Sequence, residues 1–124
     1  MRLNEMQQRV NDNSALVHRG RFVTLTFTLG IGKTDYLVDI AAGKIANIRQ
    51  RRLPTDSGVF AIRANSDSWR RHWQPIPPRD YHDIFAMLAK DNLSVDGQLI
   101  PLMQNLQYFK DVIASIRQRD GGTS

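Results

Sequence analysis

Cysteine is absent from the 124 residues of the chain. This absence excludes disulfide bridges, thiolate metal sites and cysteine nucleophiles. Long apolar runs are absent too, and no stretch approaches the roughly 20 residues that a membrane-spanning helix needs. Residues 1–15 alternate polar and apolar side chains and have no continuous apolar segment before a small-residue cleavage site, which is not typical of a secretory signal. These absences predict a cytoplasmic protein.

What the chain does contain is typical of a folded domain. The apolar fraction is 41% and the charged fraction 23%, close to globular averages. The length predicts a single domain over residues 1–124, with a core at about 20–116, an N-terminal helix at about 3–18 and a flexible tail at 117–124. No repeat, linker or low-complexity segment divides it.

The chain has a net charge of +5, and much of the excess lies among the arginines between Arg49 and Arg79. This charge predicts a solvated basic face with weak contact to an anionic membrane surface. No zinc-finger spacing, ribonucleoprotein motif or basic helix accompanies it, so we expect no specific nucleic-acid partner.

Hydrophobic periodicity predicts an α+β fold. A helix is expected first, followed by four strands at hairpin spacing, two short helices, a fifth strand and a long final helix. The order favours a five-stranded, mostly antiparallel sheet covered on one face by helices. The predicted strands are 22–29, 36–40, 45–51, 59–64 and 93–96. The short helices are expected to be capped at Asn65 or Ser66 and at Asp80, and the last helix to run unbroken from about 99 to 116.

No constellation of residues points to catalysis. His18, His72 and His82 lack the spacing of a helix-borne metal site, and no serine lies in a glycine-flanked elbow. The stretch Gly30–Lys33 lies between two strands, whereas a phosphate-binding loop must open a helix, so it predicts a hairpin turn. The aspartates are scattered. We therefore expect a protein that is not an enzyme, with no metal and no cofactor.

The order of elements and several local sequences resemble the sterol carrier protein family of non-specific lipid-transfer domains, over residues 20–116. The resemblance is clearest in Leu93-Ser94-Val95-Asp96-Gly97, which precedes an apolar helix. Other matching segments are Phe22–Leu29, Tyr36–Ile40 with the turn at Gly43, Val59–Ala64 and Ser66-Asp67-Ser68-Trp69. The chain departs from the family at Gln98, where an acidic residue is usual, and in the proline-rich loop from Gln74 to Arg79.

The resemblance implies an apolar cavity between sheet and helices that binds or carries a lipid-like molecule such as a fatty acyl chain or a sterol. Pattern and resemblance together place ten residues on its wall: Phe60, Ile62, Trp69, Trp73, Phe85, Leu88, Leu102, Met103, Leu106 and Phe109. Arg63, Arg70 or Arg71 could then meet an anionic head group, with a solvated surface position still the favoured interpretation of these arginines.

Two alternatives remain open at this stage. The first is a non-catalytic interaction or accessory module with a filled core, which forms a homodimer through an exposed apolar patch. The second is a small enzyme for an apolar substrate, with His72 or His82 as the proton carrier. This second alternative predicts that one of the two histidines faces the cavity and has a shifted pKa.

Overall fold

Five strands form one sheet in the order β3-β2-β1-β4-β5 in the computed structural model, which describes residues 3–53 and 55–117. All neighbouring pairs are antiparallel except β1 and β4, which are parallel. This confirms the predicted α+β class and the mostly antiparallel sheet. The strands are β1 Leu25–Ile31, β2 Thr34–Ala41, β3 Lys44–Gln50, β4 Phe60–Ala64 and β5 Ser94–Gly97.

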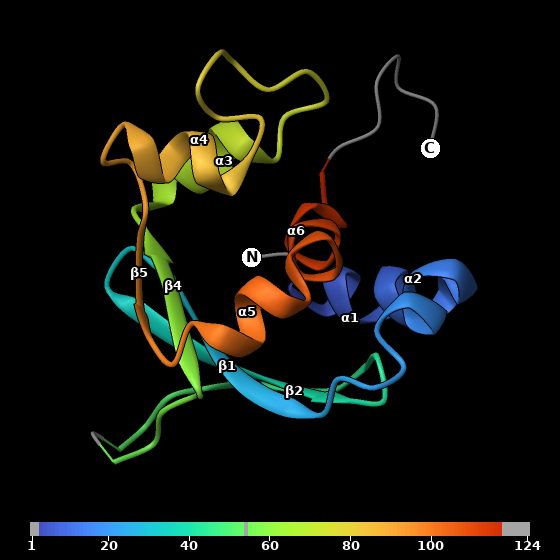
Figure 1. Cartoon of the computed structure of the whole chain (residues 1–124). Helices are drawn as coiled ribbons and strands as arrows, with labels where there is room; N and C mark the ends of the chain where they lie inside the picture. The colour runs from blue at the N-terminus through green and yellow to red at the C-terminus, as the bar shows by residue number, and fades with distance from the viewer. Residues whose placement is uncertain (1–2, 54, 118–124) are drawn as a thin grey trace.

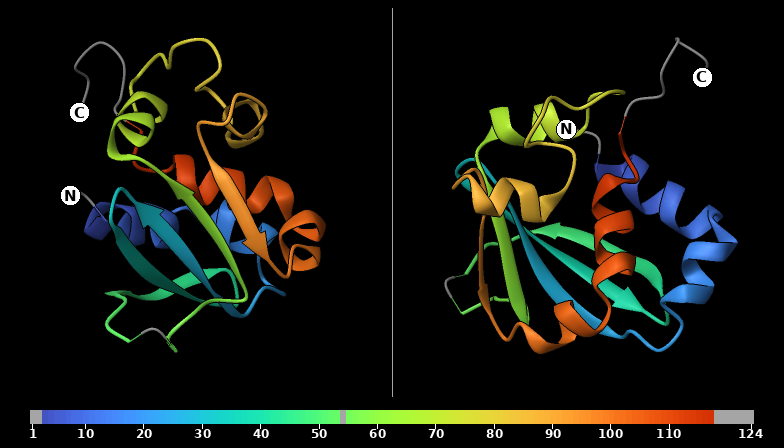
Figure 2. Two further views of the ribbon diagram at one scale, coloured as in Figure 1. Left: turned by 90° about the vertical axis from the view of Figure 1, so that its left-hand side faces the viewer. Right: turned by 45° about the horizontal axis from the view of Figure 1, so that its top comes forward.

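Helices cover one side of this curved sheet (Figure 1). Four of them, α1, α2, α5 and α6, lie over the strands, while α3 and α4 stand at one end of the sheet, as the side view in Figure 2 also shows. Their bounds are α1 Leu3–Asp12, α2 Ser14–Arg19, α3 Ser66–His72, α4 Ile84–Ala89, α5 Ile100–Gln104 and α6 Leu106–Ala114. No helix in the described ranges is long and apolar enough to cross a membrane.

Two helices that the sequence predicts as continuous are each broken at an asparagine. The N-terminal one divides at Asn13, whose side chain accepts a hydrogen bond from the Leu16 N–H at 3.1 Å and so caps α2. The C-terminal one divides at Asn105, whose side-chain amide donates to the Pro101 carbonyl at 3.0 Å. In both cases a local hydrogen bond of the amide side chain replaces continuation of the helix.

The boundaries of strands β2 to β5 differ from prediction by one or two residues, and two other elements begin three residues later than predicted. The first strand begins at Leu25 rather than Phe22, whose side chain is exposed, and it continues through Gly30. The cap of α4 is Asp83, which accepts from the Phe85 N–H at 2.7 Å, rather than Asp80. Asp80 instead has a left-handed backbone with φ of 73°, which does not suit a helix cap. Of the predicted tail, only Arg117 lies within the described residues.

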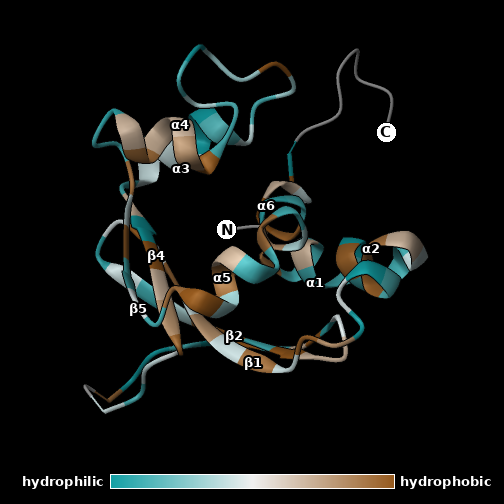
Figure 3. Ribbon diagram, viewed as in Figure 1, coloured by the Kyte–Doolittle hydropathy of each residue, from teal (hydrophilic) through white to brown (hydrophobic). Residues whose placement is uncertain are grey.

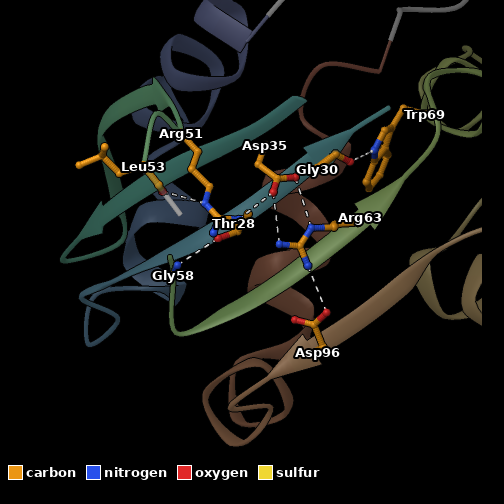
Figure 4. Close-up of polar contacts among 9 residues, drawn as sticks. All are labelled: Thr28, Gly30, Asp35, Arg51, Leu53, Gly58, Arg63, Trp69 and Asp96. Atoms are coloured by element: carbon orange, nitrogen blue, oxygen red, sulfur yellow. Dashed lines mark hydrogen bonds and ion pairs between the residues drawn. The ribbon is translucent and has the colours of Figure 1, made fainter. Parts of the chain in front are cut away.

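Side chains alternate across the sheet as a strand requires. Phe27, Leu29 and Ile31 of β1 point toward the helices and are buried, and their neighbours on β2 and β4 continue this apolar layer. The opposite, helix-free face carries charged pairs: Figure 4 shows Arg63 between Asp35 and Asp96. The helix side therefore carries the main apolar layer of the sheet, although Leu37 and Ala61 are also buried on the opposite face. This layer makes the helix side the candidate location of an apolar site.

Candidate apolar binding site

Three phenylalanines fill the middle of the layer between the sheet and α6. Phe27 of β1 and Phe60 of β4 stack at 5.4 Å between ring centroids. Phe109 of α6 packs edge-on against both, at 5.5 and 5.1 Å. Beside them, the buried Tyr108 donates from its hydroxyl to the Gly43 carbonyl at 2.7 Å, and burial raises its pKa to about 12. This part of the interior is occupied by side chains.

Two tryptophans fix α3 on the end of the sheet. Asn65 caps the helix by accepting from the Ser68 N–H, and the rings of Trp69 and Trp73 then stack one turn apart at 5.2 Å. The Trp69 indole donates to the Gly30 carbonyl of β1 at 2.8 Å, and the Trp73 indole donates to the Ile113 carbonyl of α6 at 2.9 Å. The N–H groups of both indoles thus donate to backbone carbonyls, as buried indoles generally require.

Apolar side chains become exposed where α4, β5 and α5 surround this core. Phe85 and Leu88 of α4, Val95 of β5 and Leu106 of α6 are partly buried against it. We call these four residues, together with Ile100 and Met103 of α5, the apolar rim. The α5 pair is more open, since Ile100 is 70% and Met103 54% exposed. In Figure 3, α4 and α5 carry apolar stretches on either side of the end of α6.

Charge is missing from two of the segments that contribute to the rim. Helix α4, from Ile84 to Ala89, has no ionisable residue, and neither does the stretch 97–107 that contains α5. Clusters of exposed apolar groups without intervening charge are typical of binding surfaces. The rim is therefore the best candidate for contact with an apolar molecule.

Lys110 of α6 closes one end of the rim. Its ammonium group lies 2.9 Å from the Asp83 carboxylate and 5.2 Å from the centre of the Phe85 ring. Leu106 is one helical turn before Lys110, so both lie on the side of α6 that faces α4. This contact joins Phe85 of α4 to the side of α6 that also carries Leu106.

His72, the last residue of α3, is the one buried histidine of the three and is 2% exposed. Burial, and secondarily the charge of Arg117, lower its pKa from 6.5 to about 4 despite a hydrogen bond to the Tyr81 carbonyl. Its ring is consequently neutral at pH 7. His82 is exposed.

The ten predicted wall residues divide into two groups. Six are buried in the core that forms the floor of the site, and three lie partly buried at the rim, while Met103 is mainly exposed. The buried six are Phe60, Ile62, Trp69, Trp73, Leu102 and Phe109; the partly buried three are Phe85, Leu88 and Leu106. Val95 and Ile100 are rim residues that the prediction missed, although the uncharged stretch 97–107 could have indicated Ile100.

The arginines predicted to meet an anionic head group are engaged elsewhere. Arg63 lies on the helix-free face, where it forms two hydrogen bonds to Asp35 at 3.2 and 3.3 Å. Burial alone would raise the pKa of Asp35, but the hydrogen bonds and charges of Arg63 and Arg51 outweigh it and lower this pKa. Arg70 and Arg71 both pair with Asp67. The prediction for Arg63 is wrong because residues 60 and 62 point to one face of β4 and residue 63 to the other.

A depression of about 880 Å³ lies between α1, α2 and α6, away from the rim. Its lining is largely polar, and none of the ten predicted wall residues takes part in it. Arg9 there donates to the carbonyls of Ser115 and Arg117, and Arg19 pairs with Asp111. Its charged groups are thus used to join the N-terminal helices to α6. Elsewhere in the described ranges, no three histidine or carboxylate side chains come together as a metal site would need.

Solved structures similar to this chain share its architecture over most of its length. A crystal structure of sterol carrier protein 2 superposes with a TM-score of 0.73 at 12% identity, covering 94% of this chain and 93% of that one. The chain has the sterol carrier protein fold. The sterol carrier fold also appears in a conserved hypothetical protein of Thermus thermophilus, described as possibly a sterol carrier protein. That structure gives a TM-score of 0.64 at 12% identity, with 94% and 86% coverage.

A third structure of the sterol carrier fold is the ubiquinone synthesis protein UbiJ-SCP2, with a TM-score of 0.57 at 12% identity and coverage of 88% and 82%. By sequence, the chain matches no family model and no curated protein. The predicted resemblance is therefore confirmed at the level of the fold. At these identities the fold alone is shared, and the ligand has to be argued from this chain's own residues.

Proposed function

We propose that the protein binds a lipid-like apolar molecule at the rim between α4, β5 and α5, without catalysing a reaction on it. The observation that carries this proposal is the uncharged apolar rim, which is continuous with the core on the helix side of a sterol carrier fold. The phenylalanine trio occupies the space under α6. We therefore place the ligand on the α4 and α5 side of the trio.

The driving force is removal of apolar surface from water. Burial of apolar area contributes about 25 cal/mol per Å². A ligand that covers the exposed parts of Ile100 and Met103 removes apolar surface of the protein and of the ligand itself from water. Methionine is suited to this role because its unbranched side chain adapts to guests of different shape. We expect broad selectivity for the apolar part of the ligand.

Displacement of a fluorescent fatty-acid probe, followed beside native mass spectrometry of the purified protein, tests this proposal. Met103→Trp and Leu106→Trp should weaken probe binding about tenfold or more, because a bulkier ring obstructs the rim. Leu53→Trp is the matched control, since Leu53 is 59% exposed, similar to Met103, but lies in the loop before β4. Equal binding in all three variants, or no binding by the natural chain, contradicts the proposal.

The accessory module remains a second candidate because the phenylalanine trio fills part of the interior. In that case Ile100 and Met103 would bury themselves against a second copy of the chain. Sedimentation velocity over a range of concentrations distinguishes the two candidates. A dimer that dissociates on Ile100→Ser substitution, in a protein that binds no probe, would favour the module.

A further inference from the structure

Phe22 lies in the turn between α2 and β1, and its side chain is 86% exposed. The chain is held in place on both sides of this residue. Val23 is buried and its N–H donates to the Gly20 carbonyl at 2.8 Å. Gly20 in turn packs so closely on Tyr108 that a Cβ there would lie 2.2 Å from the ring. A fixed turn thus keeps an aromatic ring in water, where it lacks the apolar contacts that stabilise buried rings.

Cations accompany this exposed ring. The guanidinium of Arg21 lies 4.7 Å from the centre of the Phe22 ring, which combines a charge with an apolar surface. Lys44 is the exposed first residue of β3. The residue before it, Gly43, donates from its N–H to the Val23 carbonyl at 3.2 Å. The start of β3 therefore adjoins the turn that carries Phe22.

The sheet topology brings α5 to the same end of the molecule. Strand β1 begins where β2 ends and, because β4 runs parallel to β1, also where β4 begins. Strand β5 is antiparallel to β4 and ends there, shortly before α5. In the left view of Figure 2, α5 and the segment that leads into β1 both lie on the right-hand side. We call this end of the molecule the basic-apolar edge, and its exposed residues are Arg21, Phe22, Lys44, Ile100 and Met103.

The segments that carry these five residues contain no acidic residue. They are 13–34, 40–55 and 97–110. Asp39 and Asp96, which border two of them at this end of the sheet, pair with Arg49 and Arg63. Exposed apolar groups flanked by cations and without acids match a surface that is negatively charged outside and apolar beneath, as an anionic lipid bilayer is.

We propose that the basic-apolar edge docks the protein on the surface of an anionic lipid bilayer. Its apolar side chains enter the interface, and its two cations contact lipid phosphates. Helix α1, although amphipathic, does not offer such a surface, because its apolar residues are buried. The inference goes beyond the proposed function: docking brings the open side of the apolar rim, at α5, to a bilayer, which is a source of lipid-like molecules.

Co-sedimentation with vesicles made of equal parts of phosphatidylglycerol and phosphatidylcholine tests the inference, beside vesicles of phosphatidylcholine alone. The natural chain should bind the neutral vesicles about tenfold more weakly than the mixed ones, and added salt should weaken binding to the mixed ones. Lys44→Gln should weaken binding to the mixed vesicles about fivefold. Lys33→Gln is the matched control, because it removes the same charge from an exposed turn at the opposite end of the sheet, and it should change binding by less than about twofold.

The apolar part of the edge has its own pair of variants. Phe22→Ala should weaken binding to the mixed vesicles about tenfold, since the ring leaves water on docking. Ile76→Ala is the control, because Ile76 is 74% exposed but lies between α3 and α4, at the other end of the sheet. In Phe22→Trp the added indole should shift its emission to shorter wavelength with the mixed vesicles, whereas Ile76→Trp should show no shift.

Equal binding of Phe22→Ala and the natural chain, or equal binding to charged and neutral vesicles, would overturn the docking. Self-association that is lost in Phe22→Ala, without vesicle binding, would overturn it as well and assign the edge to a second copy of the chain. The fatty-acid probe separates this inference from the proposed function, because Phe22 and Lys44 are not rim residues. Probe binding without vesicle binding would remove only the docking, and vesicle binding without probe binding would remove only the proposed function.

Discussion

Several buried polar side chains of this chain form hydrogen bonds to the backbone, which offset the cost of their burial. Trp69, Trp73 and Tyr108 each direct their one donor to a backbone carbonyl that lies far away in the sequence. Thr28 is buried on the helix-free face and accepts from the Gly58 N–H at 3.0 Å. Gly58 allows this approach because a Cβ there would lie 2.5 Å from the Phe27 Cα. His72 differs from these residues, since only one of its two ring nitrogens is satisfied within the described part of the chain.

The buried ring of His72 should make the protein sensitive to mild acid. The unfolded chain binds a proton below pH 6.5, while the folded chain resists it until about pH 4, because burial, Arg117 and His82 outweigh the Tyr81 carbonyl and Asp83. Between these values the unfolded state holds more protons, so stability falls as the pH falls. The loss over the whole interval is about 3 kcal/mol, and the stability is fully present above pH 6.5.

Urea unfolding between pH 5 and 7.5 measures this effect. The carboxyl groups with lowered pKa values, Asp35, Asp67 and Asp83, release their stabilisation only below this range. The pH dependence of the unfolding free energy should therefore become weaker in His72→Phe and stay unchanged in His82→Gln. Parallel profiles for the natural chain and His72→Phe would show that the buried ring is not the source.

At the scale of elements, side-chain caps mark the start of three helices, α2, α3 and α4. Hydrophobic periodicity along the chain and the order of the elements were sufficient to predict the five-stranded sheet, its mostly antiparallel pairing and the helical cover. The breaks at Asn13 and Asn105 were not predicted, because apolar periodicity continues across both residues and only the side-chain hydrogen bonds interrupt the backbone. Contacts between residues far apart in the sequence, such as that of Lys110 with Phe85, could not be predicted from the sequence either, because they depend on how α4 and α6 pack together.

The cap at Asn13 gives a direct test at this scale. Asn13→Ala removes the acceptor for the Leu16 N–H and should lower the free energy of unfolding by about 1 kcal/mol. Ser14→Ala, at the next and likewise exposed position, should change it by less than about 0.5 kcal/mol. Thermal unfolding followed by circular dichroism compares the two. An equal effect of both substitutions would mean that the break between α1 and α2 does not depend on this hydrogen bond.

At the scale of the whole molecule, different elements contribute the packed core and the proposed binding surface. The phenylalanine trio joins β1, β4 and α6, while α4 and α5 carry apolar groups that remain partly in water. The sequence prediction named Phe60, Phe109 and four of the rim residues as apolar wall, but it did not include Phe27, Val95 or Ile100 and could not separate floor from rim. That separation depends on which rings meet in three dimensions, as Phe27, Phe60 and Phe109 do.

If the phenylalanine trio limits the depth of the proposed site, a smaller side chain in the trio should lower the stability of the fold and strengthen binding of an apolar ligand. Phe109→Leu removes part of the ring that packs edge-on against Phe27 and Phe60, and we expect a loss of about 1–3 kcal/mol in unfolding free energy. The space released is apolar and adjoins the rim, so an apolar dye should bind several times more tightly.

Ile45→Val is the control, because it also trims a buried side chain but lies on β3 beneath α1. It should cost about 1 kcal/mol and leave dye binding unchanged. Tighter binding in both variants would point to general loosening of the fold, whereas unchanged binding in Phe109→Leu would separate the trio from the site and favour the accessory module.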